Sequence, residues 1–164
     1  MKLGKEYWIE KLGLLPHPEG GFYKEVYRSD ETISGLPSRY QSQRSFGTSI
    51  YFLLGSEDKS AFHRLQSDEI WFYHSGSSVK IHIIHPDGTR EDKIVGADIE
   101  SGQQLQVLIP KGTWFAAKVM LPDNYVLVSC TVCPGFEFAD FELANRWELI
   151  EKYPQHRILI ENFT

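Results

Sequence analysis

Short runs of alternating apolar and polar residues, separated by glycine and proline turns, recur through most of this chain. In the clearest run, residues 79–84, the first, third and fifth residues are apolar, whereas Lys80 and His82 are expected to face solvent. The turn His85–Gly88 follows, and the chain returns through residues 90–95 as a hairpin. Short strands at near-regular spacing predict an all-β sandwich or barrel.

Helices are expected only near the two ends of the chain, over residues 4–13 and from about residue 143 to 153. A long polar loop is expected over residues 30–45, where lids and partner-exchange elements often occur. No internal repeat and no linker interrupts the pattern, so residues 1–164 are expected to form a single domain. The other expected strands are residues 22–29, 45–54, 60–76, 104–109, 113–121 and 125–133.

Charge and hydropathy limit the classes of partner. The net charge of −5 argues against nucleic acid as a partner, because binding it requires a basic patch or stripe. No apolar run approaches the roughly 20 residues that cross a bilayer, and the first residues do not resemble a signal peptide. We therefore expect a soluble, cytoplasmic protein with neither nucleic acid nor a membrane as a partner.

Two cysteines, Cys130 and Cys133, form a C-x-x-C pair at the end of an expected strand. Residues three apart on a strand face opposite sides, so a disulfide between them is geometrically poor. Two cysteines are also only half of a structural zinc site, and the chain contains no second pair. We interpret both as small buried strand residues rather than as a redox pair.

The stretch Ala61–Gly76 carries the densest set of reactive side chains. His63, Glu69, Trp71 and Tyr73 all have odd numbers, so they share one face if the turn between them keeps register. A histidine titrates near neutral pH, a glutamate can orient it, and a phenol can donate a proton. The sequence therefore predicts His63, Glu69 and Tyr73 as catalytic residues.

Aromatic and basic residues suggest how a substrate would be held. Trp71 and Phe115 would supply flat apolar walls, which suit a sugar ring, a base or a methylated cation. Arg28, Arg44 and Arg64 are candidates to bind a carboxylate or phosphate near the mouth of a pocket. The alternative is a histidine that is hydrogen-bonded to a glutamate inside a core filled with aromatic residues. The coincidence of polar and aromatic residues on one face favours a small-molecule pocket.

Two patches resemble the paired motifs of the cupin superfamily, which are small jelly-roll barrels. His63, Glu69 and Gly76 fall on the first motif, with six residues between Glu69 and Gly76. Pro110 and Gly112 match the frame of the second motif. On its own, each of these motifs is loose.

Three further elements, taken together, resemble one specific group, the one-domain cupins of unknown function. They are His17–Gly21 (HPEGG), Ser67–Trp71 and Pro134–Phe136 (PGF). This resemblance covers nearly the whole chain. It implies a double-stranded β-helix, that is, a jelly-roll cupin barrel, with short N- and C-terminal helices. It also implies a homodimer that exchanges or packs an N-terminal strand.

The chain departs from the usual cupin pattern at the metal ligands. Leu65, Phe115 and Val119 stand where that pattern places two histidines and an asparagine, so only His63 and Glu69 remain. Two ligands do not hold a transition metal against water and competing chelators. We therefore expect no metal cofactor, and a degenerate metal site at His63 and Glu69 is kept as an alternative.

Among cupins without a metal, the arrangement is similar to that of the nucleotide-sugar 3,5-epimerases. In that family a barrel histidine removes the proton α to a sugar ketone, and a tyrosine returns one. The resemblance implies that His63 is the base, and Tyr73 and Tyr125 are both candidates for the acid. The resulting hypothesis is an epimerase or isomerase of a small polar carbonyl compound, and the alternatives are a non-catalytic binding module and a metal-dependent enzyme.

Overall fold

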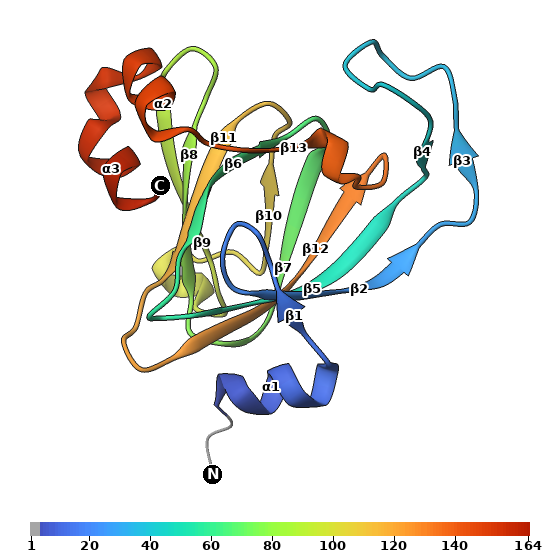
Figure 1. Cartoon of the computed structure of the whole chain (residues 1–164). Helices are drawn as coiled ribbons and strands as arrows, with labels where there is room; N and C mark the ends of the chain where they lie inside the picture. The colour runs from blue at the N-terminus through green and yellow to red at the C-terminus, as the bar shows by residue number, and fades with distance from the viewer. Residues whose placement is uncertain (1–3) are drawn as a thin grey trace.

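The computed structural model describes residues 4–164 and contains two large antiparallel sheets that face each other (Figure 1). The first sheet has six strands, in the spatial order β1 (Leu15–Pro16), β2 (Phe22–Arg28), β5 (Thr48–Gly55), β12 (Tyr125–Cys133), β7 (Asp68–Gly76) and β10 (Gln106–Ile109). The second has five, in the order β13 (Phe141–Leu143), β6 (Ser60–Leu65), β11 (Trp114–Val119), β8 (Val79–Ile84) and β9 (Arg90–Val95).

The main core lies between the two sheets. The apolar residues of the alternating strand β8, Val79, Ile81 and Ile83, are fully buried there, together with Phe115 from the neighbouring strand β11 and Phe52 from the facing sheet. This burial follows from the strand period of two, which sends every second side chain inward. The expectation of an all-β jelly-roll with short helices near its ends is confirmed.

The expected loop over residues 30–45 is largely irregular, but it contains a small two-stranded sheet of β3 (Thr32–Ile33) and β4 (Arg44–Ser45). Figure 1 shows this segment standing out to one side of the two large sheets. Three short 3₁₀ helices also occur, η1 (Ile99–Ser101), η2 (Phe138–Asp140) and η3 (Pro154–His156).

The first helix, α1 (Lys5–Leu12), forms as expected and ends at Gly13, which has a left-handed backbone conformation (φ 64°). Trp8, Ile9 and Leu12 pack against a cluster on the outer side of the first sheet that includes Leu53. No helix within residues 4–164 is both long enough and apolar enough to span a membrane.

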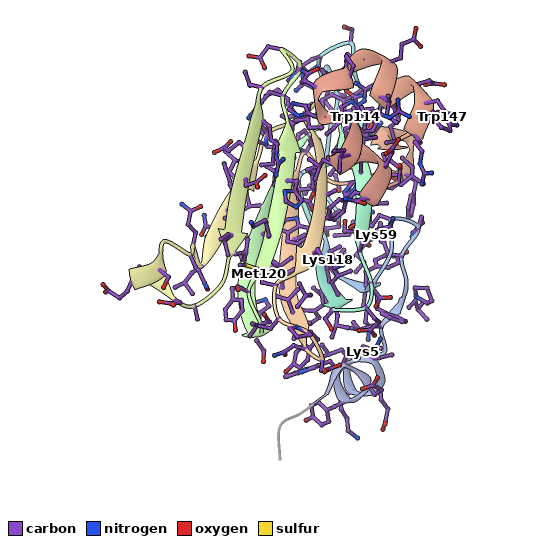
Figure 2. All side chains as sticks on the ribbon, turned by 90° about the vertical axis from the view of Figure 1, so that its left-hand side faces the viewer. Lys5, Lys59, Trp114, Lys118, Met120 and Trp147 are labelled. Carbon is purple, nitrogen blue, oxygen red and sulfur yellow. The ribbon has the colours of Figure 1, made fainter. Side chains whose placement is uncertain are left out.

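The C-terminal region differs from the expectation of one helix ending near Pro154. Helix α2 (Arg146–Lys152) is followed by a second helix, α3 (Arg157–Asn162). Both helices lie against the outer face of the second sheet, where Figure 2 shows Trp114 beside them. Phe163, directly after α3, covers His82, which is only 9 % exposed; the two ring centroids are 5.1 Å apart. The prediction that His82 faces solvent was wrong because this strand is covered on both faces.

Both cysteines are free thiols. Cys130 points into the main core, as expected, whereas Cys133 is exposed rather than buried. The two side chains differ because residues three apart on a strand face opposite sides.

Candidate functional site

A cavity of about 300 Å³ opens beside the main core. This volume lies at the lower end of the range typical of small-molecule sites, about 300–1,000 Å³. Strands β2, β5, β6, β7 and β12 contribute to its wall, as do the turn after β1 and the segment around η2. Six aromatic side chains line it: Tyr23, Phe52, Trp71, Phe136, Phe138 and Phe141.

The turn that joins β1 to β2 brings two ionisable side chains, His17 and Glu19, into this cavity. Gly20 follows with a φ of 111°, and a Cβ atom there would overlap the backbone carbonyl of Lys59. Only glycine permits so close an approach of two backbones. The carbonyl oxygen of Glu19 accepts a hydrogen bond from the backbone N–H of Ala61 at 2.8 Å, which fixes the turn against β6.

Glu19 and His63 form a buried ion pair on the cavity wall. The Nε2 atom of His63 lies 3.0 Å from Oε2 of Glu19, and the Ser60 hydroxyl donates to Oε1 at 2.8 Å. On its other side, Nδ1 of His63 lies 2.7 Å from the carbonyl oxygen of Ala61. A carbonyl oxygen and a carboxylate both accept hydrogen bonds, so both ring nitrogens of His63 donate.

The electrostatics of the pair agree with this geometry. Burial lowers the pKa of His63, but the charge of Glu19 and the hydrogen bonds to Glu19 and Ala61 outweigh burial, so the pKa is raised. Burial raises the pKa of Glu19, but the charge of His63 and its hydrogen bond outweigh burial, so that pKa is lowered. Both shifts therefore favour the charged pair, an imidazolium at His63 and a carboxylate at Glu19.

His17 remains neutral. Its Nδ1 accepts the backbone N–H of Glu19 at 3.2 Å, so the ring proton is on Nε2. Burial lowers the pKa of His17, and this effect exceeds the opposing effect of the Glu19 charge. His17 thus offers a neutral N–H donor inside the cavity.

Glu69 is the second carboxyl group of the cavity interior. It is 7 % exposed, and its Oε2 atom has no hydrogen-bond partner among the described residues. Burial raises the pKa of Glu69, and the charge of Glu19 raises it further, to about 7, against the opposing effects of His63, Cys130 and Trp71. Glu69 can therefore take up and release a proton near neutral pH.

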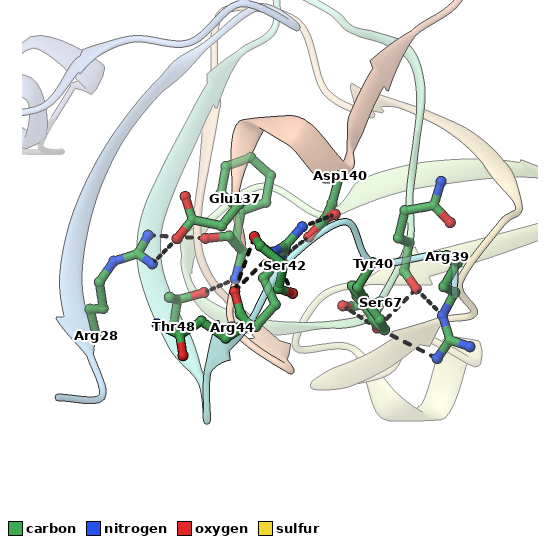
Figure 3. Close-up of polar contacts among 12 residues, drawn as sticks. Arg28, Arg39, Tyr40, Ser42, Arg44, Thr48, Ser67, Glu137 and Asp140 are labelled. Carbon is green, nitrogen blue, oxygen red and sulfur yellow. Dashed lines mark hydrogen bonds and ion pairs between the residues drawn. The ribbon is translucent and has the colours of Figure 1, made fainter. Parts of the chain in front are cut away.

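Arg28 lies at the cavity, where it is held by two exposed carboxylates. Its Nη2 atom lies 2.8 Å from Glu25 Oε2, and its Nη1 atom lies 2.8 Å from Glu137 Oε1. Arg28 also donates to the carbonyl oxygen of Phe136 at 3.0 Å. Figure 3 shows Arg28 reaching from β2 to the segment that carries Glu137.

The other two candidate arginines do not line the cavity. Arg44 is 1 % exposed and makes a bidentate ion pair with Asp140, at 2.6 Å from Nε and 2.7 Å from Nη2 (Figure 3). Arg64 pairs with Glu142 at 2.7 Å, and its guanidinium lies 4.6 Å from the centre of the Trp114 ring. Neither guanidinium is placed to bind a ligand in the cavity.

Two other sequence-predicted residues do not line the cavity. Tyr73 packs against the main core and donates its hydroxyl to the carbonyl oxygen of Gly76 at 2.7 Å. Phe115 packs on the ring of His63, with 4.0 Å between ring centroids. The structure therefore brings His63, Glu69, Trp71 and Arg28 together at the cavity, and it does not bring Tyr73, Phe115, Arg44 or Arg64 there.

Sequence reasoning missed His17 and Glu19 as site residues. In the sequence, residues 17–21 contribute only to the resemblance to one-domain cupins, and no local pattern places them beside residue 63. The sequence did contain a signal for these two residues: His17 and Glu19 come just before two adjacent glycines. Adjacent glycines permit the backbone to approach another strand closely, which can bring nearby side chains into a shared site.

The donor set does not fit a metal ion. Leu65 lines the cavity and Phe115 covers one face of His63, where the usual cupin ligands would stand. The Nε2 atom of His63 is already bound to Glu19. Within residues 4–164, no group of three or more His, Cys, Asp or Glu side chains is arranged to hold a metal.

Comparisons with known proteins agree with the fold. The family model described as "Cupin superfamily (DUF985)" matches residues 6–144. An uncharacterized protein of Saccharomyces cerevisiae is 32% identical over 139 residues, which cover 77% of this chain and 68% of the yeast protein.

Two solved structures are similar over almost their full length. A crystal structure of a protein from Shewanella oneidensis is 38% identical, with a TM-score of 0.89, and covers 99% of this chain and 98% of its own. A hypothetical protein from Leishmania major is 37% identical, with a TM-score of 0.90, and covers 99% of both chains.

Oxalate decarboxylase from Bacillus subtilis shares only the fold. It is 14% identical, with a TM-score of 0.57 over 91% of this chain, and this chain spans only 36% of its length.

Proposed function

We propose that this chain, which belongs to the cupin superfamily, binds a small α-hydroxy carbonyl compound in its cavity and isomerises it by proton transfer. One observation supports this proposal above all others. Two buried carboxyl groups share one cavity in different environments: Glu19 is paired with His63, which lowers its pKa, whereas burial and the charge of Glu19 raise the pKa of Glu69 to about 7. Carboxyl groups whose environments separate their pKa values in this way are typical of acid–base catalysis.

Glu69 acts as the base in this proposal. Both ring nitrogens of His63 are engaged, by Glu19 and by the carbonyl of Ala61, so His63 has no free lone pair with which to accept a proton. The role of His63 is to hold Glu19 as a carboxylate, whose charge then raises the pKa of Glu69. The base expected from the sequence is thus replaced by its neighbour on the same cavity wall.

The proton transfers balance without an oxidant or a reductant. The carboxylate of Glu69 removes the proton from the carbon that bears the hydroxyl group, and the electron pair moves to the carbonyl oxygen. His17 Nε2–H gives its proton to that oxygen and receives the hydroxyl proton, and Glu69 returns its proton to the former carbonyl carbon. A neutral N–H donor stabilises the charge that develops on the oxygen.

Hydrogen–deuterium exchange tests this proposal. In D₂O, the wild-type protein should exchange the carbon-bound proton of at least one compound in a panel of α-hydroxy ketones and aldehydes. Glu69→Gln should reduce the rate at least about 100-fold, which is typical for loss of a general base. Glu151→Gln is the matched control, because Glu151 is exposed on α2 and does not line the cavity.

The pH profile adds a second measurement. The wild-type rate should rise with pH and level off above about 7, as Glu69 becomes ionised. Absence of exchange across the whole panel would contradict the proposal. Full activity of Glu69→Gln together with inactivity of His63→Asn would assign the base to His63 instead.

The six aromatic side chains of the wall favour a second candidate, a non-catalytic binding module. A ligand of such a module raises the melting temperature according to RT ln(1 + [L]/Kd) and is recovered unchanged. Stabilisation without any isotope exchange would distinguish this candidate from an isomerase.

A further inference from the structure

The cavity has an excess of negative charge. Four glutamates line it, Glu19, Glu25, Glu69 and Glu137. Among the described residues that line it, the positively charged side chains are Arg28 and His63, and His17 is neutral. His63 is matched by Glu19, and Arg28 is shared by Glu25 and Glu137. One negative charge therefore remains near Arg28, and Glu69 adds a second when it is ionised.

Each arginine expected to bind an anionic ligand is already neutralised by a carboxylate. Arg28 binds Glu25 and Glu137, Arg44 binds Asp140, and Arg64 binds Glu142; of the three, only Arg28 touches the cavity. A phosphate or carboxylate would have to displace Glu25 or Glu137 before it could bind Arg28. This charge distribution disfavours a nucleotide sugar and every other anionic ligand.

Two features of the wall point to a cation. Phe136, Phe138 and Phe141 stand edge to face, with ring centroids 5.1–6.4 Å apart, in the same segment as Glu137. Aromatic faces beside carboxylates are a typical environment for organic ammonium groups. Independently of these residues, Oε2 of Glu69 is buried in the wall without a hydrogen-bond partner among the described residues, so it is free to accept a hydrogen bond from a polar group of a ligand.

We propose that the ligand of this cavity is a small organic cation, whose ammonium group lies between the Phe136–Phe141 rings and Glu137 and whose polar end reaches Glu69. This inference deepens the proposed function: the substrate is a carbonyl compound that also carries an amine. Only the assignment of the carbonyl end of the ligand rests on the proposed function. The geometry of the ammonium site does not depend on whether any reaction takes place.

Binding of three unreactive probes of similar shape tests the charge preference. They are choline, its uncharged carbon analogue 3,3-dimethylbutan-1-ol, and the anion 3,3-dimethylbutanoate, each titrated by calorimetry at constant ionic strength. Choline should bind at least about tenfold more tightly than the alcohol, and the anion more weakly than both. Equal binding of choline and the alcohol, tighter binding of the anion, or no saturation by choline in the millimolar range would overturn the proposal.

Two variants of charged residues that line the cavity should change the affinity for choline in opposite directions. Arg28→Met leaves two carboxylates without their cation, so choline should bind about fivefold more tightly, whereas an anionic ligand would be lost. Glu137→Gln should weaken choline binding about fivefold, which matches one charge at about 4 Å in water. Glu151→Gln should change neither value, and a melting curve of each variant shows that it is folded.

These probes lack a reactive carbonyl, so the two proposals fail separately. Choline binding without isotope exchange would refute the isomerase and leave the cation site intact. Isotope exchange of an uncharged hydroxy ketone, with no preference for choline over the alcohol, would refute the cation site and leave the isomerase intact.

Discussion

Replacing Glu69 by glutamine should change how the stability of the protein depends on pH. The pKa of Glu69 rises from its usual 4.5 to about 7 in the folded state, first because of burial and then because of the charge of Glu19. The folded state therefore binds more protons than the unfolded state between these two values. Stability from this group is fully present below pH 4.5 and is lost as the pH rises through about 7.

The magnitude follows from the difference between the two pKa values. At about 1.4 kcal/mol for each pKa unit, the ionised Glu69 lowers the free energy of unfolding by about 3 kcal/mol above pH 7. For a chain of this size, that corresponds to a change of about 6–12 °C in melting temperature. Glutamine has nearly the same shape as the protonated acid, so Glu69→Gln should match the wild type at pH 4.5 and exceed it at pH 8 by about 3 kcal/mol.

Urea unfolding at pH values between 4.5 and 8, followed by circular dichroism, measures this difference. Other titrating groups contribute to both proteins, so comparison with the variant isolates Glu69. A difference between the two proteins that stays constant from pH 4.5 to 8 would refute the reasoning. Glu151→Gln should follow the wild type throughout. The charged and titratable groups that face Glu69, or share its cavity, are Glu19, His63, Cys130, His17, Tyr23, Glu25, Arg28 and Glu137.

Two further predictions concern stability. Asp140→Asn leaves Arg44 buried beside a neutral partner, so the free energy of unfolding measured in urea should fall by up to about 3–5 kcal/mol. Arg44→Met combined with Asp140→Leu should recover most of this loss. Ile160→Ala, at a fully buried position on α3, should cost about 2–5 kcal/mol. Ile158→Ala, 78 % exposed on the same helix, should stay within about 0.5 kcal/mol. Similar losses at both isoleucines would show that α3 does not pack as described.

The fold could be predicted from the sequence because the alternation of apolar and polar residues along a strand indicates which side chains face inward. Val79, Ile81 and Ile83 illustrate this, since each is fully buried. The same pattern could not show that His82, on the opposite face, is covered by Phe163, directly after α3. That burial depends on Phe163, and no local rule links the two positions.

Only half of the candidate site could be found in the same way. Strand parity placed Glu69 and Trp71 on one wall, and both line the cavity with His63. Glu19 could not be assigned, because its contact with His63 depends on a turn that crosses to another strand. The arginines were misleading for a related reason: a sequence shows Arg44 as a free cation, and only the tertiary structure supplies Asp140.

The cavity wall is assembled from segments near both ends of the described chain, with Glu19 from the first turn and Phe141 from β13. During synthesis, the N-terminal part emerges first and can begin to fold while later residues are still being added. Until the segment with Phe136, Phe138 and Phe141 arrives, the groove that holds Glu69 lacks one wall. A ligand of this cavity would therefore bind only the completed barrel, and its binding could serve as a conformational probe that separates finished molecules from nascent ones.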